Sequence, residues 1–286
     1  MDRGRWTCAP DDDPTVRVTA MRARELGRTP VVVGDRVGLV GEVSGAPDGL
    51  ARIVRVDERS SVLRRTADDT DPYERIVVAN AEQLLIVASL ADPPPRTGLI
   101  DRCLVAGYAG GLEPVLCLTK RDLAAPDAVL ERYAALDLPV LITAPETGVD
   151  EVRSRLAGRI SVLVGHSGVG KSTLVNRLVP DAFRVTAAVS GVGKGRHTSS
   201  SAVAMPLPGG GWVVDTPGIR SFGLAHVTPD DVVRAFADLA DAIANCPRGC
   251  THLGPPADPE CALDDLGGAA RRRAMSVRAL LAEILR

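Results

Sequence analysis

The segment GHSGVGKST, Gly165 to Thr173, decides the fold of this chain of 286 residues. Its spacing, G-x-x-x-x-G-K-[ST], is that of a phosphate-binding loop, in which backbone N–H groups surround the phosphates of a nucleotide and the lysine reaches the terminal ones. The apolar run ISVLV precedes the loop and LVNRLV follows it, as expected for the strand and helix that such a loop joins. The segment predicts a nucleotide-binding α/β domain, yet 164 residues come before it.

Composition indicates a globular protein of more than one domain. The hydrophobic content is 45% and the net charge is -2, which excludes a general polyanion-binding protein. The sequence has neither a long apolar run nor the apolar core of a signal peptide, so we expect a cytoplasmic protein without a membrane partner. Six cysteines without an export signal argue against a disulfide framework.

The first 75 residues predict a small β-barrel. Ten arginines and six acids lie between Pro14 and Thr66, within apolar runs that are typical of short strands and are separated by glycine-containing turns. The commonest barrel of this size with an oligonucleotide-binding face is the OB-fold. We therefore predict an OB-like RNA-binding domain over residues 1–75, while solvated arginines on a plain barrel remain an open alternative.

From Ile76 onward, apolar strands alternate with helical stretches, which predicts a parallel α/β sheet. One strand, EPVLCL, ends in TKRD, Thr119 to Asp122. A carboxylate at the position of Asp122 can accept paired hydrogen bonds from the ring N–H and exocyclic amine of guanine, which adenine does not offer. A charged turn is the alternative interpretation of four such residues, but their place after a buried strand favours base recognition.

Two further segments follow the phosphate loop. The strand WVVDTPG, Trp212 to Gly218, ends in Asp215, which we expect to hold Mg²⁺ through water, and in Gly218, whose N–H would contact the terminal phosphate. The glycine-rich GVGKGRHTSS, Gly191 to Ser200, is typical of a switch loop, with Thr198 reaching Mg²⁺ together with Ser172 of the phosphate loop.

The order of these motifs along the chain is rotated. Base recognition by TKRD comes first, then the Thr143-Ala144 loop, the phosphate loop, the switch and DTPG. The same motifs in rotated order resemble those of Ras-like GTPases. We therefore predict a circularly permuted GTPase domain over residues 76–222, which is physically permitted because domain termini lie at the surface and often near each other.

The segment CPRGCTHLGPPADPEC predicts a metal site. Three cysteines and one histidine supply the four ligands of a closed tetrahedral structural zinc site: Cys246, Cys250, His252 and Cys261. Three unpaired cysteines in an exposed loop are the alternative. Predicted helices over TPDDVVRAFADLADAIA and AARRRAMSVRALLAEILR flank the segment and define a helical zinc-binding domain over residues 223–286. Within the last helix, Arg271 to Arg273 fit either a solvated face or contact with RNA phosphates.

A β-barrel before a permuted GTPase domain and a Cys/His segment after it resemble the ribosome small-subunit-dependent GTPases of the RsgA family. The resemblance covers nearly the whole chain and includes ANAEQLLIVASL and the switch GKGRHT. It implies a late maturation factor that binds the small ribosomal subunit and its 16S rRNA with GTP, hydrolyses GTP to GDP when docked, and has no DNA partner. We expect a monomer. This sequence departs from the family pattern at Thr119, where asparagine is usual, and in the gaps of three, one and eight residues between the Cys/His ligands.

The motifs and the resemblance together give the predicted site. The residues expected to bind GTP are Thr119, Lys120, Asp122, Thr143, Ala144, Gly165, His166, Ser167, Gly168, Val169, Gly170, Lys171, Ser172, Thr173 and Gly218. Mg²⁺ is expected at Ser172, Thr198 and Asp215, and one structural Zn²⁺ at the Cys/His segment.

The group that activates water is less evident. Ras-like sites use a glutamine directly after the D-x-x-G glycine, and Ile219 occupies that place here. His197 is the candidate for holding the attacking water, although a loop residue that contacts RNA or solvent fits the same position. The function predicted is ribosome-stimulated GTP hydrolysis. A nucleotide-gated RNA-binding module and an ATP-using P-loop kinase are the alternatives, the kinase being weakest because TKRD and DTPG would both be accidental.

Overall fold

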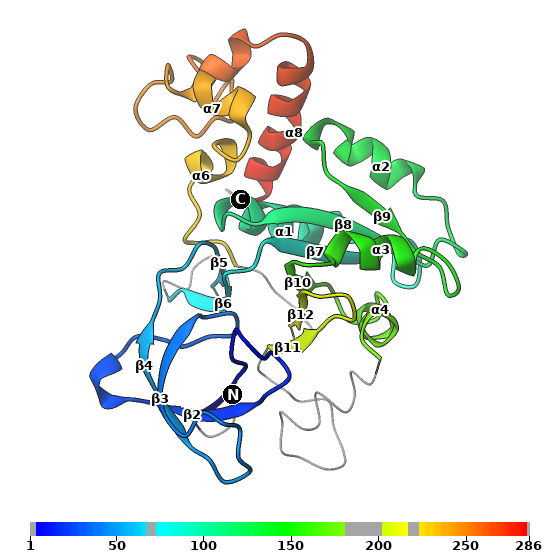
Figure 1. The fold of residues 1–286 in the computed structure, drawn as a ribbon. Coiled ribbons are helices and arrows are strands. Elements are labelled where there is room, and N and C mark those ends of the chain that lie inside the picture. The colour runs from blue at the N-terminus through cyan, green and yellow to red at the C-terminus, as the bar shows by residue number, and fades with distance from the viewer. Residues whose placement is uncertain (1–3, 67, 69–72, 181–201, 217–222, 285–286) are drawn as a thin grey trace.

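The computed structural model describes residues 4–66, 68, 73–180, 202–216 and 223–284. Three parts follow one another along the chain: an N-terminal β region, a central α/β sheet and a C-terminal group of helices. Figure 1 shows the central sheet between the other two, with the β region on one side and the C-terminal helices on the opposite side. The predicted order of fold classes is therefore confirmed.

The N-terminal region contains a sheet with the order β1-β2-β4-β3 in the described part of the chain. These strands are β1 (Arg5–Cys8), β2 (Val18–Arg22), β3 (Val37–Gly41) and β4 (Ala51–Val56). Alternate residues point inward, so Val18 and Ala20 of β2 and Ala51 and Ile53 of β4 form a small separate core. The strand β1 lies before Pro14, outside the apolar runs on which the prediction of the barrel rested, and was therefore missed.

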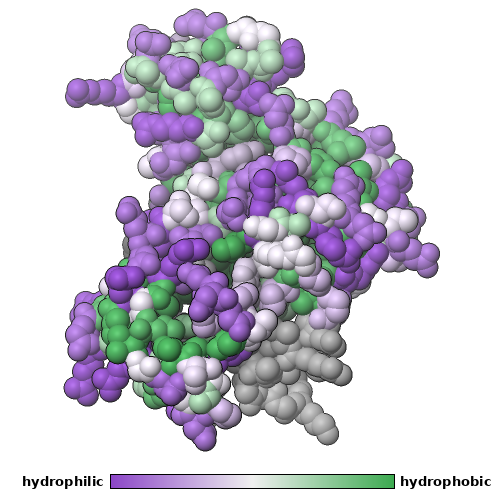
Figure 2. All heavy atoms as spheres, in the orientation of Figure 1, coloured by the Kyte–Doolittle hydropathy of each residue, from purple (hydrophilic) through white to green (hydrophobic). Residues whose placement is uncertain are grey.

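A hairpin connects this region to the central sheet. It pairs β5 (Val62–Arg65) with β6 (Arg75–Ala79), and an isolated bridge joins Val33 to Val78. On the outer surface of the β region, large apolar side chains gather, as the green area at the lower left of Figure 2 shows. Exposed large hydrophobic residues in this part of the sequence include Met21, Val40, Val43, Leu50 and Val54.

The central sheet has the order β11-β12-β10-β7-β8-β9 among the residues described. Its strands are β7 (Gln83–Ser89), β8 (Glu113–Thr119), β9 (Val140–Ile142), β10 (Ile160–Val164), β11 (Val203–Pro206) and β12 (Trp212–Asp215). All neighbours are parallel except the edge pair β11 and β12. The polar loops after β7, β8, β9, β10 and β12 therefore meet at one edge, where ligands of parallel α/β sheets bind.

Helices cover both faces of this sheet, which explains why β7 is buried throughout. On one face, Leu84 and Ile86 pack with α1 (Thr97–Ala109) and α2 (Asp127–Tyr133). On the other face, Leu85 and Val87 pack with α3 (Val149–Leu156) and α4 (Lys171–Leu178). Each fully buried leucine contributes about 1.5–3 kcal/mol to this sandwich.

Circular permutation is visible in the strand order. When counting starts at β10, which precedes the phosphate loop, and continues through the chain ends to β9, the spatial order reads 2-3-1-4-5-6. The loop strand therefore lies inside the sheet although it is the fourth of these strands along the chain. Permutation therefore leaves the neighbours of each strand in the sheet unchanged and moves only the positions of the chain ends.

The C-terminal helices pack on α1. They are α6 (Pro229–Val233), α7 (Ala237–Ile243) and α8 (Gly268–Ile284), and their apolar side chains belong to the same core cluster as α1. The prediction of one continuous helix through residues 228–244 was wrong. The chain leaves the helix before Phe236, whose buried ring packs against Tyr108 of α1 at a centroid distance of 4.7 Å, so burial of an aromatic side chain outweighs helix propensity.

The arginines at the start of α8 differ from one another. Arg271 and Arg272 are exposed, whereas Arg273 pairs with Asp238 at 2.9 Å and with Asp137 at 2.5 Å. Arg273 therefore joins α8 to α7 and to the turn after α2 and is not a solvated residue. Of the helices in the described residues, none has the length and apolarity needed to span a membrane.

Candidate active site and metal centre

The phosphate loop follows β10 and leads into α4. Gly168 and Gly170 have φ values of +85° and +88°, a conformation that side chains with a Cβ rarely adopt. Gly165 is required for a different reason: a Cβ there would lie 2.5 Å from the carbonyl oxygen of Val87. The glycines of the motif thus allow the backbone to turn closely over the end of the sheet.

The lysine of the loop faces the end of the neighbouring strand. Lys171 is only 8% exposed, and its Nζ contacts Asp215 Oδ1 and donates a 2.7 Å hydrogen bond to the carbonyl of Thr216. The side chain of Thr216 is held in turn by the Leu163 carbonyl at 2.7 Å. The side chains predicted to serve phosphate and Mg²⁺, Lys171 and Asp215, therefore lie side by side.

The loop after β8 is joined directly to the phosphate loop. Thr119 is 6% exposed, and its Oγ1 donates a 2.6 Å hydrogen bond to the carbonyl of Val169. The hydroxyl thus connects two predicted segments that are 50 residues apart. The sequence predicted Thr119 to bind GTP and showed it as a departure from asparagine, but did not predict this contact.

The residues predicted to recognise the base lie around this connection. Lys120 has a φ of +59°, and its Nζ donates to the carbonyl of Asp92 in the loop after β7. The backbone N–H of Arg121 donates to the Thr143 carbonyl at 3.1 Å, which brings the loops after β8 and β9 together. Asp122 is exposed, so its carboxylate is available to a base at this edge.

The Thr143-Ala144 loop is also held from α4. Arg177 Nη1 donates a 2.9 Å hydrogen bond to the Ala144 carbonyl. Thr143 is 4% exposed, and its N–H donates to the Leu118 carbonyl at 2.8 Å. The loop turns at Gly148, with φ +80°, where a Cβ would lie 2.1 Å from the Ile142 carbonyl oxygen. The helix that follows the phosphate loop therefore also holds the second loop predicted to contact the base.

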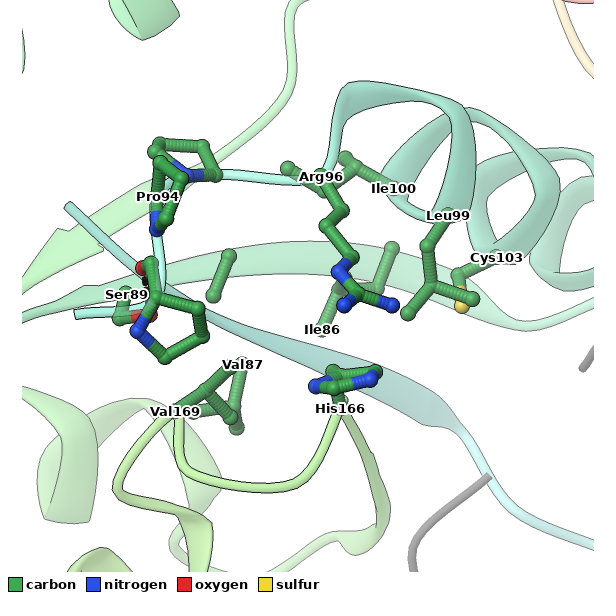
Figure 3. Close-up of a pocket in the computed structure, with 14 residues that line it drawn as sticks. Ile86, Val87, Ser89, Pro94, Arg96, Leu99, Ile100, Cys103, His166 and Val169 are labelled. Atoms are coloured by element: carbon green, nitrogen blue, oxygen red, sulfur yellow. Dashed lines mark hydrogen bonds between the residues drawn. The ribbon is translucent and has the colours of Figure 1, made fainter. Parts of the chain in front are cut away.

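A small cavity lies between β7, the start of α1 and the phosphate loop (Figure 3). Its walls are mainly apolar, including Ile86, Leu99 and Cys103, and burial raises the pKa of the Cys103 thiol to about 12. Figure 3 shows the side chains of His166 and Arg96 pointing toward one another at this cavity. The imidazole of His166 thus lies on the α1 side of the loop, at the cavity.

Several predicted residues lie outside the described part of the chain: the switch segment 191–200 with His197 and Thr198, and Gly218 and Ile219 after Asp215. Ser172, by contrast, is described and exposed at the start of α4, one residue after Lys171. The structure therefore brings together the base loops, the phosphate loop and Asp215.

The Cys/His segment forms one cluster. The ligand atoms of Cys246, Cys250, His252 and Cys261 all lie within 4.8 Å of one another. Nδ1 of His252 is 3.6 Å from Cys246 Sγ and 4.0 Å from Cys261 Sγ. Burial is the main cause that raises the pKa of Cys250 to about 12, and a bound cation would favour its thiolate form. The donor set and spacing fit a tetrahedral metal site despite the redistributed gaps.

Comparison with known proteins identifies the family. The model of the RsgA GTPase family matches residues 56–225. The chain belongs to the RsgA GTPase family. It is accordingly a GTP hydrolase, with the nucleotide motifs in the permuted order described above.

Similar proteins share most of the length of the chain. A protein of Chlorobaculum tepidum named "Small ribosomal subunit biogenesis GTPase RsgA" is 37% identical over 266 residues, covering 89% of this chain and 86% of its own. A protein of the same name from Ectopseudomonas mendocina is 40% identical over 268 residues, covering 89% of this chain and 75% of its own. The sequence similarity of RsgA proteins to this chain thus extends beyond the segment matched by the family model.

Solved structures agree with the fold. The crystal structure of YjeQ from Thermotoga maritima superposes with a TM-score of 0.70 at 26% identity, covering 100% of this chain and 96% of the other. The structure of YloQ, described as a circularly permuted GTPase, superposes with a TM-score of 0.66 at 21% identity, covering 100% of this chain and 92% of the other. The permuted sheet and its two flanking parts are therefore shared as one architecture.

Proposed function

We propose that this protein binds the small ribosomal subunit through its 16S rRNA, hydrolyses GTP there, and assists late maturation of the subunit. The observation that carries the proposal is the similarity to a protein named for small ribosomal subunit biogenesis over 89% of the chain. That similarity spans the central GTPase domain and extends into the flanking parts, where a plain nucleotide hydrolase would need no counterpart. The proposed domain boundaries are 1–75, 76–222 and 223–286, and we expect a cytoplasmic monomer.

Guanine nucleotide would bind at the carboxyl edge of the central sheet. Asp122 would accept the ring N–H and amine of guanine, and the loop of Thr143 and Ala144 would lie against the base. The contacts that hold these loops to one another support this assignment, since a base site needs fixed acceptors. The backbone N–H groups from Gly165 to Thr173, with that of Gly218, would surround the phosphates, and Thr119 and Lys120 would keep the two loops in register.

Magnesium would bind between the phosphates and the end of β12. Ser172, Thr198 and Asp215 offer the oxygen ligands that Mg²⁺ prefers, and Asp215 already lies against the phosphate-loop lysine. When bound, the ion neutralises the charge that develops on the β- and γ-phosphate oxygens. Lys171 would turn from Asp215 to the phosphates and keep the same region of the site positively charged.

The proton chemistry would be confined to one side chain of the switch. His197 would hold the attacking water by a ring nitrogen, because Ile219 has no polar group with which to do so. Gly223, the first described residue after Thr216, pairs with Thr66, the residue after β5, in an isolated bridge, and the Thr66 N–H donates a 3.0 Å hydrogen bond to the Gly223 carbonyl. Movement of the switch on loss of the γ-phosphate would therefore reach both the β region and the helices.

The Cys/His cluster would hold one structural Zn²⁺. Three sulfur atoms and one imidazole nitrogen within 4.8 Å of one another suit the tetrahedral geometry and the ligand preference of zinc. The cluster joins the segment 246–261 to the core shared by α1, α6 and α8, since Cys261 belongs to that core. Zinc would thus fix the shape of a part of the protein that faces away from the nucleotide.

The test is single-turnover GTP hydrolysis with and without saturating small ribosomal subunits, accompanied by co-sedimentation in GTP, in GDP and without nucleotide. The proposal expects GTP-dependent co-sedimentation and stimulation of hydrolysis by roughly 10²-fold or more, the size of a positioning effect. GTP-dependent binding without stimulation would instead support a nucleotide-gated RNA-binding module. If the subunit neither binds the protein nor stimulates hydrolysis, the proposed ribosomal function is wrong.

A further inference from the structure

The imidazole of His252 is held from two sides. It is 2% exposed, with Nδ1 facing the sulfur atoms of Cys246 and Cys261 and Nε2 facing the opposite way. Asp230 of α6 lies on that opposite side, with its Oδ1 2.9 Å from Nε2. Asp230 comes from a different element than the cluster and stands 22 residues before His252, so the sequence gives no sign of this pairing.

We infer that Asp230 is a positioning residue of the zinc site, which fixes the imidazole in the form that binds metal through Nδ1. This inference rests on the proposed zinc site. A neutral imidazole carries one N–H, and the nitrogen that carries it is set by the hydrogen bond available to it. Because Asp230 accepts from Nε2–H, the lone pair remains on Nδ1, which is the nitrogen that faces the thiol groups.

The carboxylate of Asp230 is itself held in place. Asp230 is the second residue of α6, whose start is fixed by a capping box between Thr228 and Asp231. Its other oxygen, Oδ2, accepts a 2.9 Å hydrogen bond from Arg234 one turn later. One oxygen is thus committed to Arg234 and the other to His252, which leaves the carboxylate little freedom to turn away from the ring.

The main chain of His252 is held from α8. Arg278 Nε donates a 2.9 Å hydrogen bond to the His252 carbonyl, and its Nη1 donates to Asp264 at 2.7 Å. His252 has a φ of +61°, which is unfavourable for a residue with a side chain and is maintained here by contacts on both sides. A Cβ at Gly254 would lie 2.8 Å from the guanidinium carbon of Arg278, so glycine leaves room for this arginine. Two helices therefore fix His252. Asp230 of α6 holds its ring, and Arg278 of α8 holds its backbone carbonyl.

The experiment compares three variants of the full chain. Asp230→Leu removes the acceptor at similar volume, Asp230→Asn removes the charge and keeps an acceptor oxygen, and Arg234→Gln removes the ion pair on the other oxygen. Zinc affinity is measured by competition with a chelator. Nitrogen-15 chemical shifts of the histidine ring, recorded with zinc bound, report which nitrogen carries the metal and which the proton.

We expect the wild type to bind zinc through Nδ1 with the proton on Nε2. Asp230→Leu should lose about 10- to 100-fold in zinc affinity and lose the single protonated form, the usual effect of removing the partner of a metal-bound histidine. Asp230→Asn should retain the Nδ1-bound form and most of the affinity, and Arg234→Gln should match the wild type. This pattern separates an effect on the ring from loss of a negative charge at the start of α6.

Two results would overturn the inference. If Asp230→Leu binds zinc as tightly as wild type through Nδ1, or if the wild type binds zinc through Nε2, Asp230 does not position the ring. If the wild type binds no zinc in the competition assay, the metal site itself is wrong, which is a different and recognisable outcome. Cobalt(II) substitution distinguishes these cases further. The absorption of a tetrahedral site with three sulfur ligands would be present if the metal site exists but Asp230 does not position the ring, and absent if there is no metal site.

Discussion

Thr119 Oγ1 donates a 2.6 Å hydrogen bond to the carbonyl of Val169, joining the base loop to the phosphate loop. In the permuted chain these two segments are separated by two strands and two helices, yet this hydroxyl holds them as one site. The loop predicted to recognise the base and the loop predicted to hold the phosphates are therefore joined directly by the hydroxyl of one residue.

Replacing Thr119 by valine should weaken binding of GTP and GDP alike. Valine preserves the shape and removes the donor to the Val169 carbonyl, a buried neutral hydrogen bond worth about 0.5–1.5 kcal/mol, which corresponds to roughly 2- to 12-fold in affinity. Fluorescent nucleotide titration measures the change. Thr119→Ser keeps the hydroxyl and should bind near the wild-type level; a valine variant equal to both would show that the contact does not serve nucleotide binding.

Asp122→Asn should change the base that is preferred. The amide cannot accept two hydrogen bonds from guanine, whereas xanthine carries a carbonyl in place of the amine and suits an amide donor. GTP affinity should fall by at least 10-fold while affinity for xanthosine triphosphate rises, measured by competition titration. Asp127→Asn, at the start of α2, is the matched control for loss of an acid nearby, and unchanged GTP affinity in Asp122→Asn would refute the assignment.

His197→Ala should remove most of the stimulation of hydrolysis by the small ribosomal subunit. The imidazole is expected to act on water and not on the nucleotide, so GTP affinity and GTP-dependent co-sedimentation should remain near wild type. Single-turnover hydrolysis with saturating subunits measures the loss, expected to be about 10²-fold. Full stimulation of the alanine variant would mean that another group positions the water.

Cys250→Ser should disrupt the C-terminal part and spare the nucleotide site. Wild-type protein should hold one zinc per chain by metal analysis, and the variant should hold less and lose proteolytic resistance over residues 246–261. Because the C-terminal helices share a core with α1, the loss should also lower the melting temperature of the whole protein. Cys8→Ser, a change at a cysteine of β1 remote from the cluster in the fold, is the control; a variant with full zinc content would remove Cys250 from the ligand set.

His226 should make the protein less stable in mild acid. Burial is the main cause that lowers its pKa below the ordinary value of 6.5, and its Nδ1 has no hydrogen-bond partner in the described residues. As the pH falls through about 6.5, the unfolded chain takes up a proton that the folded His226 resists, so folding stability decreases. His226→Gln should therefore show a smaller drop in melting temperature between pH 7.5 and 5.5 than wild type.

The comparison for this experiment is His166→Gln, which removes a half-buried histidine of the phosphate loop. Both variants and the wild type are measured with the same free zinc concentration, because acid also competes with metal for the cysteines. The charged groups around His226 are Glu74, Arg64 and Asp231, and none of them is changed. An acid dependence identical in wild type and His226→Gln would rule out this contribution.

Local sequence determined the motifs and their order. A phosphate loop can be predicted from glycines at positions that need positive φ and from a lysine and a hydroxyl residue after an apolar run. Its neighbouring loops can be predicted from an acid near the end of each of two strands. These patterns hold wherever the segments occur in a chain. The rotated order then implied permutation, and the sheet order with β10 inside it confirms that interpretation. The four metal ligands were likewise predictable, because cysteine and histidine spacing restricts the chemistry more than it restricts the path of the chain.

Tertiary structure alone decided the contacts that join distant segments. Thr119 was predicted to bind GTP, but only packing placed its hydroxyl 2.6 Å from the Val169 carbonyl. Asp230 was an ordinary first-turn acid until α6 brought it to His252. Phe236 broke an otherwise regular helical pattern because Tyr108 of α1 offered it a buried partner. Periodicity and spacing in the sequence describe residues that are neighbours along the chain. Hydrogen bonds and ring packing between separate elements depend on how those elements dock, and only the assembled fold supplies that information.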